Sequence, residues 1–286
     1  MKNISRRQFL QALGLSTAAV AGLGLVGCGG GSNGGSASTG SSSSKVDAIK
    51  SRGKLNAGVK KDVPGYGYLD PSTNSYEGLE IDLCYQIAAA VLGVSYDDAK
   101  NQQLVNFTDV TPKTRGPLID NDQLDIVCAT YTITDDRKKS WDFSTPYRQD
   151  YIGLLIKKGS ISDLAGLDGK IIGVSQGSTT KDNIVKMLSD QGVSATPQFQ
   201  EFPDYPSIKQ ALDGGNIDVF SVDRSILGGY IDDTTELLVP DVKFGEQKYG
   251  VATKKGSDLS KVVDDKVNEL LGNGWLDEEI KTWKLL

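Results

Sequence analysis

The sequence of 286 residues contains no histidine. Histidine is the commonest metal ligand, and Ser-His-Asp triads and Cys-His pairs depend on it. The usual metal sites and these nucleophilic arrangements are therefore excluded. Catalysis by carboxyl groups is not excluded, because aspartate and glutamate also act as general acids and bases. We expect neither a metal nor a cofactor.

Cysteine is also scarce, with three residues in the whole chain. Cys28 belongs to an N-terminal segment described in the next paragraph. Cys84 lies in a helical pattern of apolar residues, and Cys128 lies in an apolar run typical of a buried strand. An oxidising compartment would permit a disulfide, but sequence spacing does not show that the two thiols meet. We expect two separate buried thiols.

Residues 1–28 have the features of a secretory signal. Arg6 and Arg7 precede Gln-Phe-Leu and a short stretch rich in alanine, glycine and leucine. This arrangement resembles a twin-arginine export signal. The sequence Leu-Val-Gly-Cys at its end resembles a bacterial lipobox, in which Cys28 becomes the lipidated first residue. A transmembrane anchor is the alternative, but the apolar stretch is short and rich in glycine.

Residues 29–46 consist almost entirely of glycine, serine, alanine, asparagine and threonine. Such a segment cannot bury much apolar surface, so we expect a flexible tether. A lipid at Cys28 and this tether would hold the rest of the protein just outside a membrane. Three basic residues leave with the signal, which changes the formal charge from −6 to −9. This acidic balance argues against nucleic acid as a partner.

The length of the remaining chain fits two α/β lobes better than one. Two stretches, 151–159 and 247–256, have a similar pattern and are interpreted as strands that cross between the lobes. We expect lobe 1 to comprise residues 47–150 and 249–286, and lobe 2 to comprise residues 151–248. The expected fold class is α/β, with two lobes and two hinge-crossing strands.

The candidate site of lobe 1 follows a buried strand expected at residues 124–129. Ligands bind at the carboxyl ends of strands in open α/β sheets, where Thr130 and Thr132 lie. Thr134 then begins a helix with Arg137 in its first turn. A planar guanidinium can bind a carboxylate through two parallel hydrogen bonds. The alternative is an ordinary surface arginine at a helix start.

In lobe 2, two strand ends supply further polar groups. One strand leads through Ser178 and Thr179 into a helix, and hydroxyls with free helix N–H groups form a small anion-binding cradle. The strand at 217–222 delivers Asp223 at its carboxyl end. If the lobes face each other, Arg137 contacts an α-carboxylate and Asp223 an α-ammonium. We predict that such a site rejects ligands that lack either group.

Several motifs resemble those of the polar amino acid family of bacterial extracellular solute-binding proteins, family 3. They are Gly78-Leu79-Glu80-Ile81-Asp82-Leu83, Thr132-Ile133-Thr134-Asp135-Asp136-Arg137, Gly177-Ser178-Thr179-Thr180 and Ser221-Val222-Asp223. The resemblance runs from about Gly53 to the C-terminus. Within the family, segments 113–118, 201–209 and 220–227 most resemble the aspartate/glutamate-binding surface antigens of the adhesin type.

The resemblance implies a two-lobe periplasmic-binding-protein fold of type II and a set of ligand contacts. It implies Arg137 on the α-carboxylate and Asp223 on the α-ammonium of an amino acid. It also implies Lys60, Arg115, Thr130 and Tyr205 around the side-chain carboxylate of the ligand. A lysine at position 60 fits an acidic side chain by charge complementarity. The expected ligand-binding residues are Lys60, Arg115, Thr130, Thr132, Arg137, Ser178, Thr179, Tyr205 and Asp223.

The resemblance also implies a function, that of the substrate-binding receptor of an ABC importer for L-aspartate or L-glutamate. Such a receptor is extracytoplasmic, monomeric and anchored by its lipid, and it closes like a hinge before it docks on the permease. One alternative is a binder of glutamine, asparagine or another polar amino acid, although Lys60 and Arg115 would pair poorly with a neutral amide.

A second and more remote alternative is a dehydratase-type enzyme on the same scaffold. Such an enzyme needs a carboxylic acid poised in the cleft. Asp223 is the one obvious candidate, and the expected contact with the ligand's ammonium group already accounts for it. We therefore expect no enzymatic activity.

Overall fold

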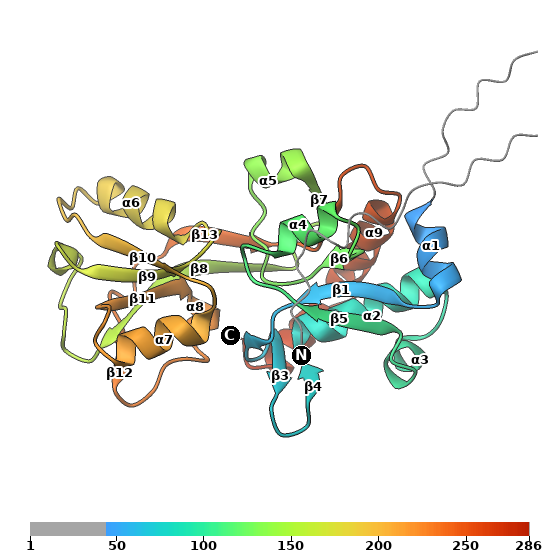
Figure 1. Cartoon of the computed structure of the whole chain (residues 1–286), viewed down its shortest axis with the longest axis horizontal. Coiled ribbons are helices and arrows are strands. Elements are labelled where there is room, and N and C mark those ends of the chain that lie inside the picture. The colour runs from blue at the N-terminus through green and yellow to red at the C-terminus, as the bar shows by residue number, and fades with distance from the viewer. Residues whose placement is uncertain (1–43, 286) are drawn as a thin grey trace, which may run out of the picture. The chain divides into compact units, whose positions relative to one another are not determined.

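The computed structural model describes residues 44–285 (Figure 1). The expected secretory signal, the lipidation site Cys28 and residues 29–43 of the expected tether lie outside the described residues. Among the helices of the described part, none is long and apolar enough to cross a membrane.

The expected end of the tether at residue 46 is wrong, because helix α1 (Lys45–Arg52) already begins at residue 45. The Ser44 hydroxyl accepts a hydrogen bond from the Asp47 N–H and so caps the helix. The same hydroxyl donates to a carboxylate oxygen of Asp258, far along the chain. This second bond attaches the start of the helix to a distant part of the chain, and no local sequence pattern could predict it.

The first lobe is built on a five-stranded sheet in the order β5-β1-β6-β14-β7. Strands β5, β1 and β6 are parallel, and β14 pairs antiparallel with both β6 and β7. The strands are β1 (Leu55–Val59), β5 (Val105–Asp109), β6 (Ile126–Val127), β7 (Trp141–Phe143) and β14 (Ala252–Lys254). A small separate sheet contains β2 (Asp62–Val63), β3 (Gly67–Asp70) and β4 (Ser75–Glu77). The helices are α1, α2 (Leu79–Leu92), α3 (Tyr96–Asn101), α4 (Arg115–Asp120), α5 (Asp135–Ser140), α9 (Leu259–Gly272) and α10 (Trp275–Thr282).

Helix α2 supplies much of the apolar core of this lobe. Gly78 precedes it with a φ of +125°, where a Cβ would lie 2.2 Å from the carbonyl oxygen of Tyr66. Glycine is therefore required at this turn. Because the turn sets the start of the helix, Glu80 in its first turn is fully buried instead of facing solvent. Cys84 of this helix and Cys128 are buried free thiols, as expected.

The second lobe is built on a sheet in the order β10-β9-β11-β8-β12, with β13 paired to β8. Strands β10, β9 and β11 are parallel, and β8 runs antiparallel to β11. The strands are β8 (Arg148–Lys157), β9 (Ile171–Ser175), β10 (Gln198–Phe202), β11 (Val219–Asp223), β12 (Thr235–Leu237) and β13 (Phe244–Tyr249). The helices are η2 (Ala165–Leu167), α6 (Thr180–Asp190), α7 (Tyr205–Asp213) and α8 (Arg224–Leu227).

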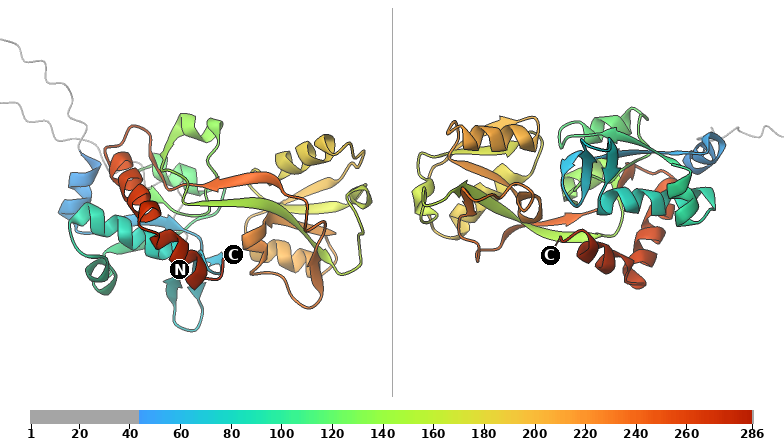
Figure 2. Two further views of the ribbon diagram at one scale, coloured as in Figure 1. Left: turned by 180° about the vertical axis from the view of Figure 1, so that it is seen from behind. Right: turned by 90° about the horizontal axis from the view of Figure 1, so that it is seen from below.

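Two long strands, β8 and β13, connect the lobes. They pair antiparallel with Tyr249 opposite Arg148, and Tyr249 also forms a bridge with Thr132 of the first lobe. Figure 2 shows both strands running side by side from one lobe to the other. The expected α/β fold with two lobes and two connecting strands is confirmed.

Residues 94–106, which are mostly polar, contain α3 and the start of the edge strand β5, whose side chains are mostly exposed. One expected element differs in its bounds. The strand expected at 124–129 is regular only at Ile126–Val127. Helix α7 begins at Tyr205, because Asp204 accepts a hydrogen bond from the Ser207 N–H and caps it.

Candidate functional site

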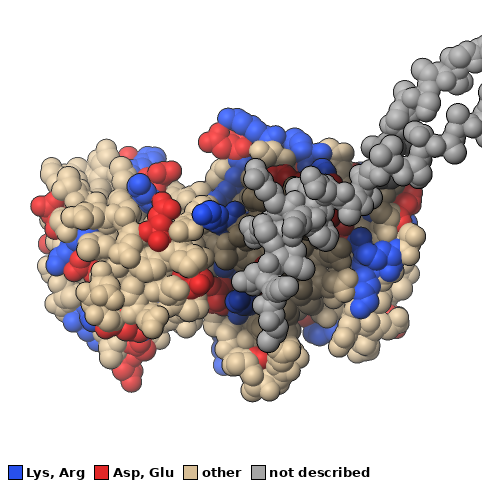
Figure 3. Space-filling view, viewed as in Figure 1, with Lys and Arg blue, Asp and Glu red and all other residues tan. Residues whose placement is uncertain are grey.

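A small cavity lies where the two lobes face each other. Eight of the nine predicted ligand-binding residues line it, namely Arg115, Thr130, Thr132, Arg137, Ser178, Thr179, Tyr205 and Asp223. Figure 3 shows charged side chains of both signs gathered along the line where the lobes meet. The cavity measures about 20 Å³, roughly the space of one water molecule. The facing side chains therefore contact one another across the cleft.

Arg137 reaches the cavity from the first turn of α5. The Thr134 hydroxyl accepts a bond of 3.1 Å from the Arg137 N–H and caps the helix, as the sequence predicts. The guanidinium donates to the carbonyl oxygen of Thr132 in its own lobe at 2.7 Å and to that of Gly177 in the other lobe at 3.1 Å. Burial, and next the neighbouring Arg115, lower the pKa of Arg137 to about 10. A carboxylate in the cavity would relieve both effects.

Asp223 ends strand β11 on the opposite wall. Its carboxylate accepts a hydrogen bond from the hydroxyl of Tyr249 on the hinge strand β13. Burial is the largest cause that raises the pKa of Asp223, to about 7, and the charge of Asp150 adds to it. A buried carboxylate of this kind is stabilised by a cation, such as an ammonium group of a ligand.

Arg115 and Thr130 form the end of the cavity in the first lobe. Arg115 Nη1 donates to the carbonyl oxygens of Ala129, at 2.6 Å, and of Thr130, at 3.2 Å. The guanidinium carbon lies 3.7 Å from the centre of the Tyr131 ring. Arg115 Nε and Thr130 Oγ1 are buried and have no hydrogen-bond partner among residues 44–285. These two groups can donate hydrogen bonds to a polar atom of a ligand.

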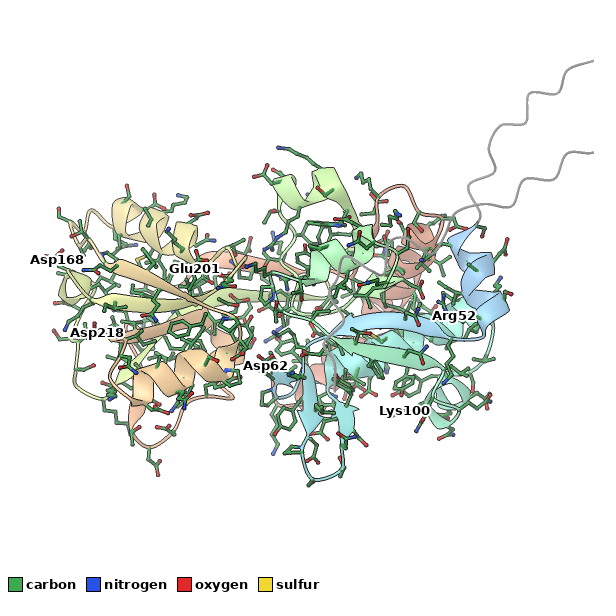
Figure 4. All side chains as sticks on the ribbon, viewed as in Figure 1. Arg52, Asp62, Lys100, Asp168, Glu201 and Asp218 are labelled. Atoms are coloured by element: carbon green, nitrogen blue, oxygen red, sulfur yellow. The ribbon has the colours of Figure 1, made fainter. Side chains whose placement is uncertain are left out.

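Lys60 is the predicted residue that does not line the cavity. It is buried behind Tyr205, with its ammonium 4.6 Å from the centre of the tyrosine ring. It forms an ion pair of 3.1 Å with Asp62, and Figure 4 places Asp62 where the first lobe faces the second. Burial lowers the pKa of Lys60, while Asp62 opposes that effect. The positive charge of Lys60 is therefore already paired with a carboxylate of the protein. The sequence analysis did not predict this ion pair.

Four further residues line the cavity and were missed from the sequence: Pro112, Thr180, Val222 and Gln247. Gln247 lies on the hinge strand β13. Its side-chain oxygen accepts from the hydroxyl of Thr132 at 2.5 Å and from that of Thr179 at 3.0 Å. It thus links the hydroxyls of the two lobes. The pattern of polar residues on β13 does not indicate that position 247 faces a ligand site.

The described residues contain no group of three or more histidine, cysteine, aspartate or glutamate side chains that could hold a metal ion. The cavity instead has positive charge on one wall and negative charge on the wall that faces it. Two guanidinium groups lie on one wall, and a carboxylate with four hydroxyl-bearing residues lies on the other. Such an arrangement can hold a small zwitterion by paired, desolvated contacts.

Comparison with known proteins adds four similarities. The family model described as bacterial extracellular solute-binding proteins, family 3, matches residues 55–285. The chain is 37% identical over 268 residues to the ABC transporter glutamine-binding protein GlnH of Bacillus subtilis, covering 91% of each chain. It is 30% identical over 250 residues to the glutamate-binding protein GluB of Corynebacterium glutamicum, covering 84% of this chain and 78% of that protein. An ancestral arginine-binding protein bound to glutamine superposes with a TM-score of 0.68 at 28% identity, covering 81% of this chain and 98% of that one.

Proposed function

The chain belongs to the bacterial extracellular solute-binding proteins of family 3 and is an extracellular amino acid-binding protein of an ABC importer, and we propose that its ligands are L-aspartate and L-glutamate. The family membership expected from the sequence motifs is thereby confirmed. The preference for acidic side chains is the finer part of the proposal. It rests on the charges around the cavity.

In the proposed complex, Arg137 and Asp223 hold the part that all α-amino acids share. Arg137 donates two hydrogen bonds to the α-carboxylate, and Asp223 accepts from the α-ammonium. Ser178 and Thr179 lie at the start of helix α6 and donate to the α-carboxylate together with free backbone N–H groups. Thr132 completes this shell. This pairing explains why each charge in the cavity has no salt-bridge partner within the part of the chain that the structure describes.

The observation that carries the preference for an acidic side chain is the state of Arg115. Arg115 is 3% exposed, and within the described residues no carboxylate lies within salt-bridge distance of its guanidinium. A buried charge without a partner is costly, so a second carboxylate on the ligand would be strongly favoured there. The Arg115 Nε and the Thr130 hydroxyl would donate to this carboxylate. Tyr205 would close the pocket from the second lobe, backed by Lys60.

A second candidate ligand is L-glutamine. The relative from Bacillus subtilis is a glutamine-binding protein, and Lys60 is already neutralised by Asp62. Both observations weaken the argument that the ligand carries a carboxylate on its side chain. Arg115 still distinguishes the two ligands, because a neutral amide would leave its charge without a counterion.

The proposed binding cycle includes an opening of the lobes. The cavity of about 20 Å³ is smaller than an amino acid, so the ligand must enter when the lobes are apart. Tyr230 of the second lobe donates to the carbonyl oxygen of Asp62 at 2.5 Å, and Arg137 bonds Gly177. These contacts break on opening and form again on closure, with β8 and β13 as the hinge. We further propose a lipid-anchored monomer without enzymatic activity that delivers the ligand to its permease.

Calorimetric titration of the purified protein with aspartate, glutamate, asparagine and glutamine tests the proposal. Tighter binding of the two acids than of the two amides, by tenfold or more, is the expected result. Binding of the amides alone would overturn the acidic preference but keep the roles of Arg137 and Asp223. Failure to bind any of the four would overturn the amino acid site as described.

A further inference from the structure

A carboxyl group that the proposed contacts do not use lies directly behind the cavity. Glu80, in the first turn of α2, is fully buried. Its Oε1 accepts hydrogen bonds from the Thr130 N–H, at 2.6 Å, and from the hydroxyl of Tyr147. Its Oε2 is buried and has no partner among residues 44–285. Thr130 therefore lies between Glu80 and the cavity in which the ligand is proposed to bind.

Thr130 is held in an unusual backbone conformation. Its φ is +44°, in the left-handed region that threonine rarely adopts. A strained residue persists only where its surroundings hold it in place. Here Glu80 binds the N–H of Thr130, and Arg115 binds the carbonyl oxygens of Ala129 and Thr130. A carboxyl group and a guanidinium group therefore fix the peptide groups on both sides of one residue that lines the cavity.

We propose that Glu80 is a positioning residue that, through Thr130 and Arg115, sets whether the pocket prefers a side-chain carboxylate or a side-chain amide. The inference rests on the proposed amino acid site and deepens it. When Glu80 is protonated, the positive charge of Arg115 is available to a ligand carboxylate. When Glu80 is ionised, it balances Arg115 from behind, and a neutral amide becomes the better partner.

The groups around Glu80 allow both states near neutral pH. Burial is the largest influence and raises the pKa of Glu80 to about 7, against hydrogen bonds from Tyr147 and Thr130 and the charges of Arg115 and Lys60. Cys128, Tyr66 and Tyr205 also face it, and the charge of Glu80 helps to keep these three groups protonated. Arg115 and Lys60 are the only two cations in this set, and Lys60 is paired with Asp62.

The test is the ratio of the affinities for aspartate and asparagine, measured by calorimetry between pH 5.5 and pH 8.5. The ratio is used because both ligands have the same α-carboxylate and α-ammonium. The titration of protein groups that bind those parts changes both affinities alike, so its effect largely cancels in the ratio. In the wild-type protein we expect the preference for aspartate to fall about tenfold or more as the pH rises, since one negative charge appears behind a desolvated pocket. A flat profile in the wild-type protein overturns the inference without any variant.

Glu80→Gln separates this role from simple packing. The glutamine oxygen can still accept from the Thr130 N–H, so the variant should bind aspartate at pH 6 within about threefold of the wild type, while its affinity ratio should vary less than about threefold with pH. Asp125→Asn is the matched control. Asp125 is a buried carboxylate that accepts from the Asn56 N–H on the same sheet, away from the cavity. It should leave the pH profile of the ratio as in the wild type.

The outcomes distinguish this inference from the proposed function. If the wild-type protein binds neither ligand, the proposed function fails. If it binds both and Glu80→Gln keeps the wild-type pH profile, only the role of Glu80 is overturned. If Asp125→Asn flattens the profile as strongly as Glu80→Gln, the effect reflects any buried carboxylate in this lobe, and the role of Glu80 is again overturned.

Discussion

The hydroxyl of Tyr249 donates to the carboxylate of Asp223 and also lies 3.3 Å from a carboxylate oxygen of Asp150. Asp150 is on the hinge strand β8, Tyr249 is on the hinge strand β13, and Asp223 is on the ligand-facing end of β11. One hydroxyl thus stands between two carboxylates. The proposed ligand contact of Asp223 is therefore held in place by the same strands on which the lobes turn.

Tyr249→Phe should weaken binding of every amino acid ligand at pH 7 by about tenfold, because a hydrogen bond to a charged group contributes about 1.5–3 kcal/mol. Loss of this bond raises the pKa of Asp223 further, so affinity should recover in part at pH 8.5. Tyr151→Phe is the control, since within residues 44–285 its hydroxyl is hydrogen-bonded only to Gln149, on the exposed side of β8. Unchanged affinity in Tyr249→Phe would show that the hydroxyl does not support Asp223.

Binding should also depend on pH in the wild-type protein. The pKa of Asp223 is raised to about 7 by burial and by Asp150, and only its ionised form can pair with an ammonium group. A proton therefore competes with the ligand below pH 7, and the affinity for aspartate and asparagine alike should fall as the pH decreases, approaching tenfold per pH unit. Calorimetry in buffers of different ionisation enthalpy should detect proton release on binding at pH 6. Binding without proton release would contradict the contact of Asp223.

Arg137→Ala should abolish measurable binding of all amino acids, because it removes both hydrogen bonds to the α-carboxylate. Arg137→Lys should restore only a small part, since an ammonium group lacks the planar two-donor geometry. Lys138→Ala on the same helix is the control, because that side chain is exposed and pairs with Asp135. Micromolar affinity in Arg137→Ala would remove Arg137 from the proposed site.

Arg115→Ala should weaken aspartate about a hundredfold or more, and asparagine much less, because only aspartate loses a charge partner in a buried pocket. The comparison is made within the variant, so a general loosening of the Ala129–Thr130 backbone affects both ligands alike. Equal losses for the two ligands would refute the assignment of Arg115 to the side-chain carboxylate.

The stability of the ligand-free protein should fall as the pH rises from about 4 to about 7. Glu80 and Asp223 have their pKa raised to about 7 in the folded state, against about 4 in an unfolded chain. Between these values the folded state holds protons that the unfolded state has released, so each group should lower the free energy of unfolding by about 2–4 kcal/mol across this range. Urea unfolding at several pH values measures the slope. Glu80→Gln and Asp223→Asn should each flatten it, and a rising slope would contradict both assignments.

The sequence predicted the parts of the site that depend on local rules. Thr134 has the composition and spacing of a helix cap, and Asp223 follows an apolar strand, so both positions could be placed before the structure was known. The burial of Lys60 against Tyr205 could not, because Tyr205 belongs to the second lobe and the contact depends on how that lobe packs against the first. The same holds for Gln247, which faces the cavity from a hinge strand. The burial of Glu80 follows from the turn at Gly78, which sets where helix α2 begins.

The order of the strands in the two lobes has a consequence for how the chain folds as it is synthesised. The second lobe is one continuous segment, from β8 to β13, and its sheet is complete once residue 249 has left the ribosome. The sheet of the first lobe needs β14, which lies between β6 and β7 although it comes last in the chain. The second lobe is thus free to form while the first still waits for its final strand and for helices α9 and α10. A nascent chain that stalls once residue 249 has emerged from the ribosome would therefore display a finished second lobe beside an incomplete first one.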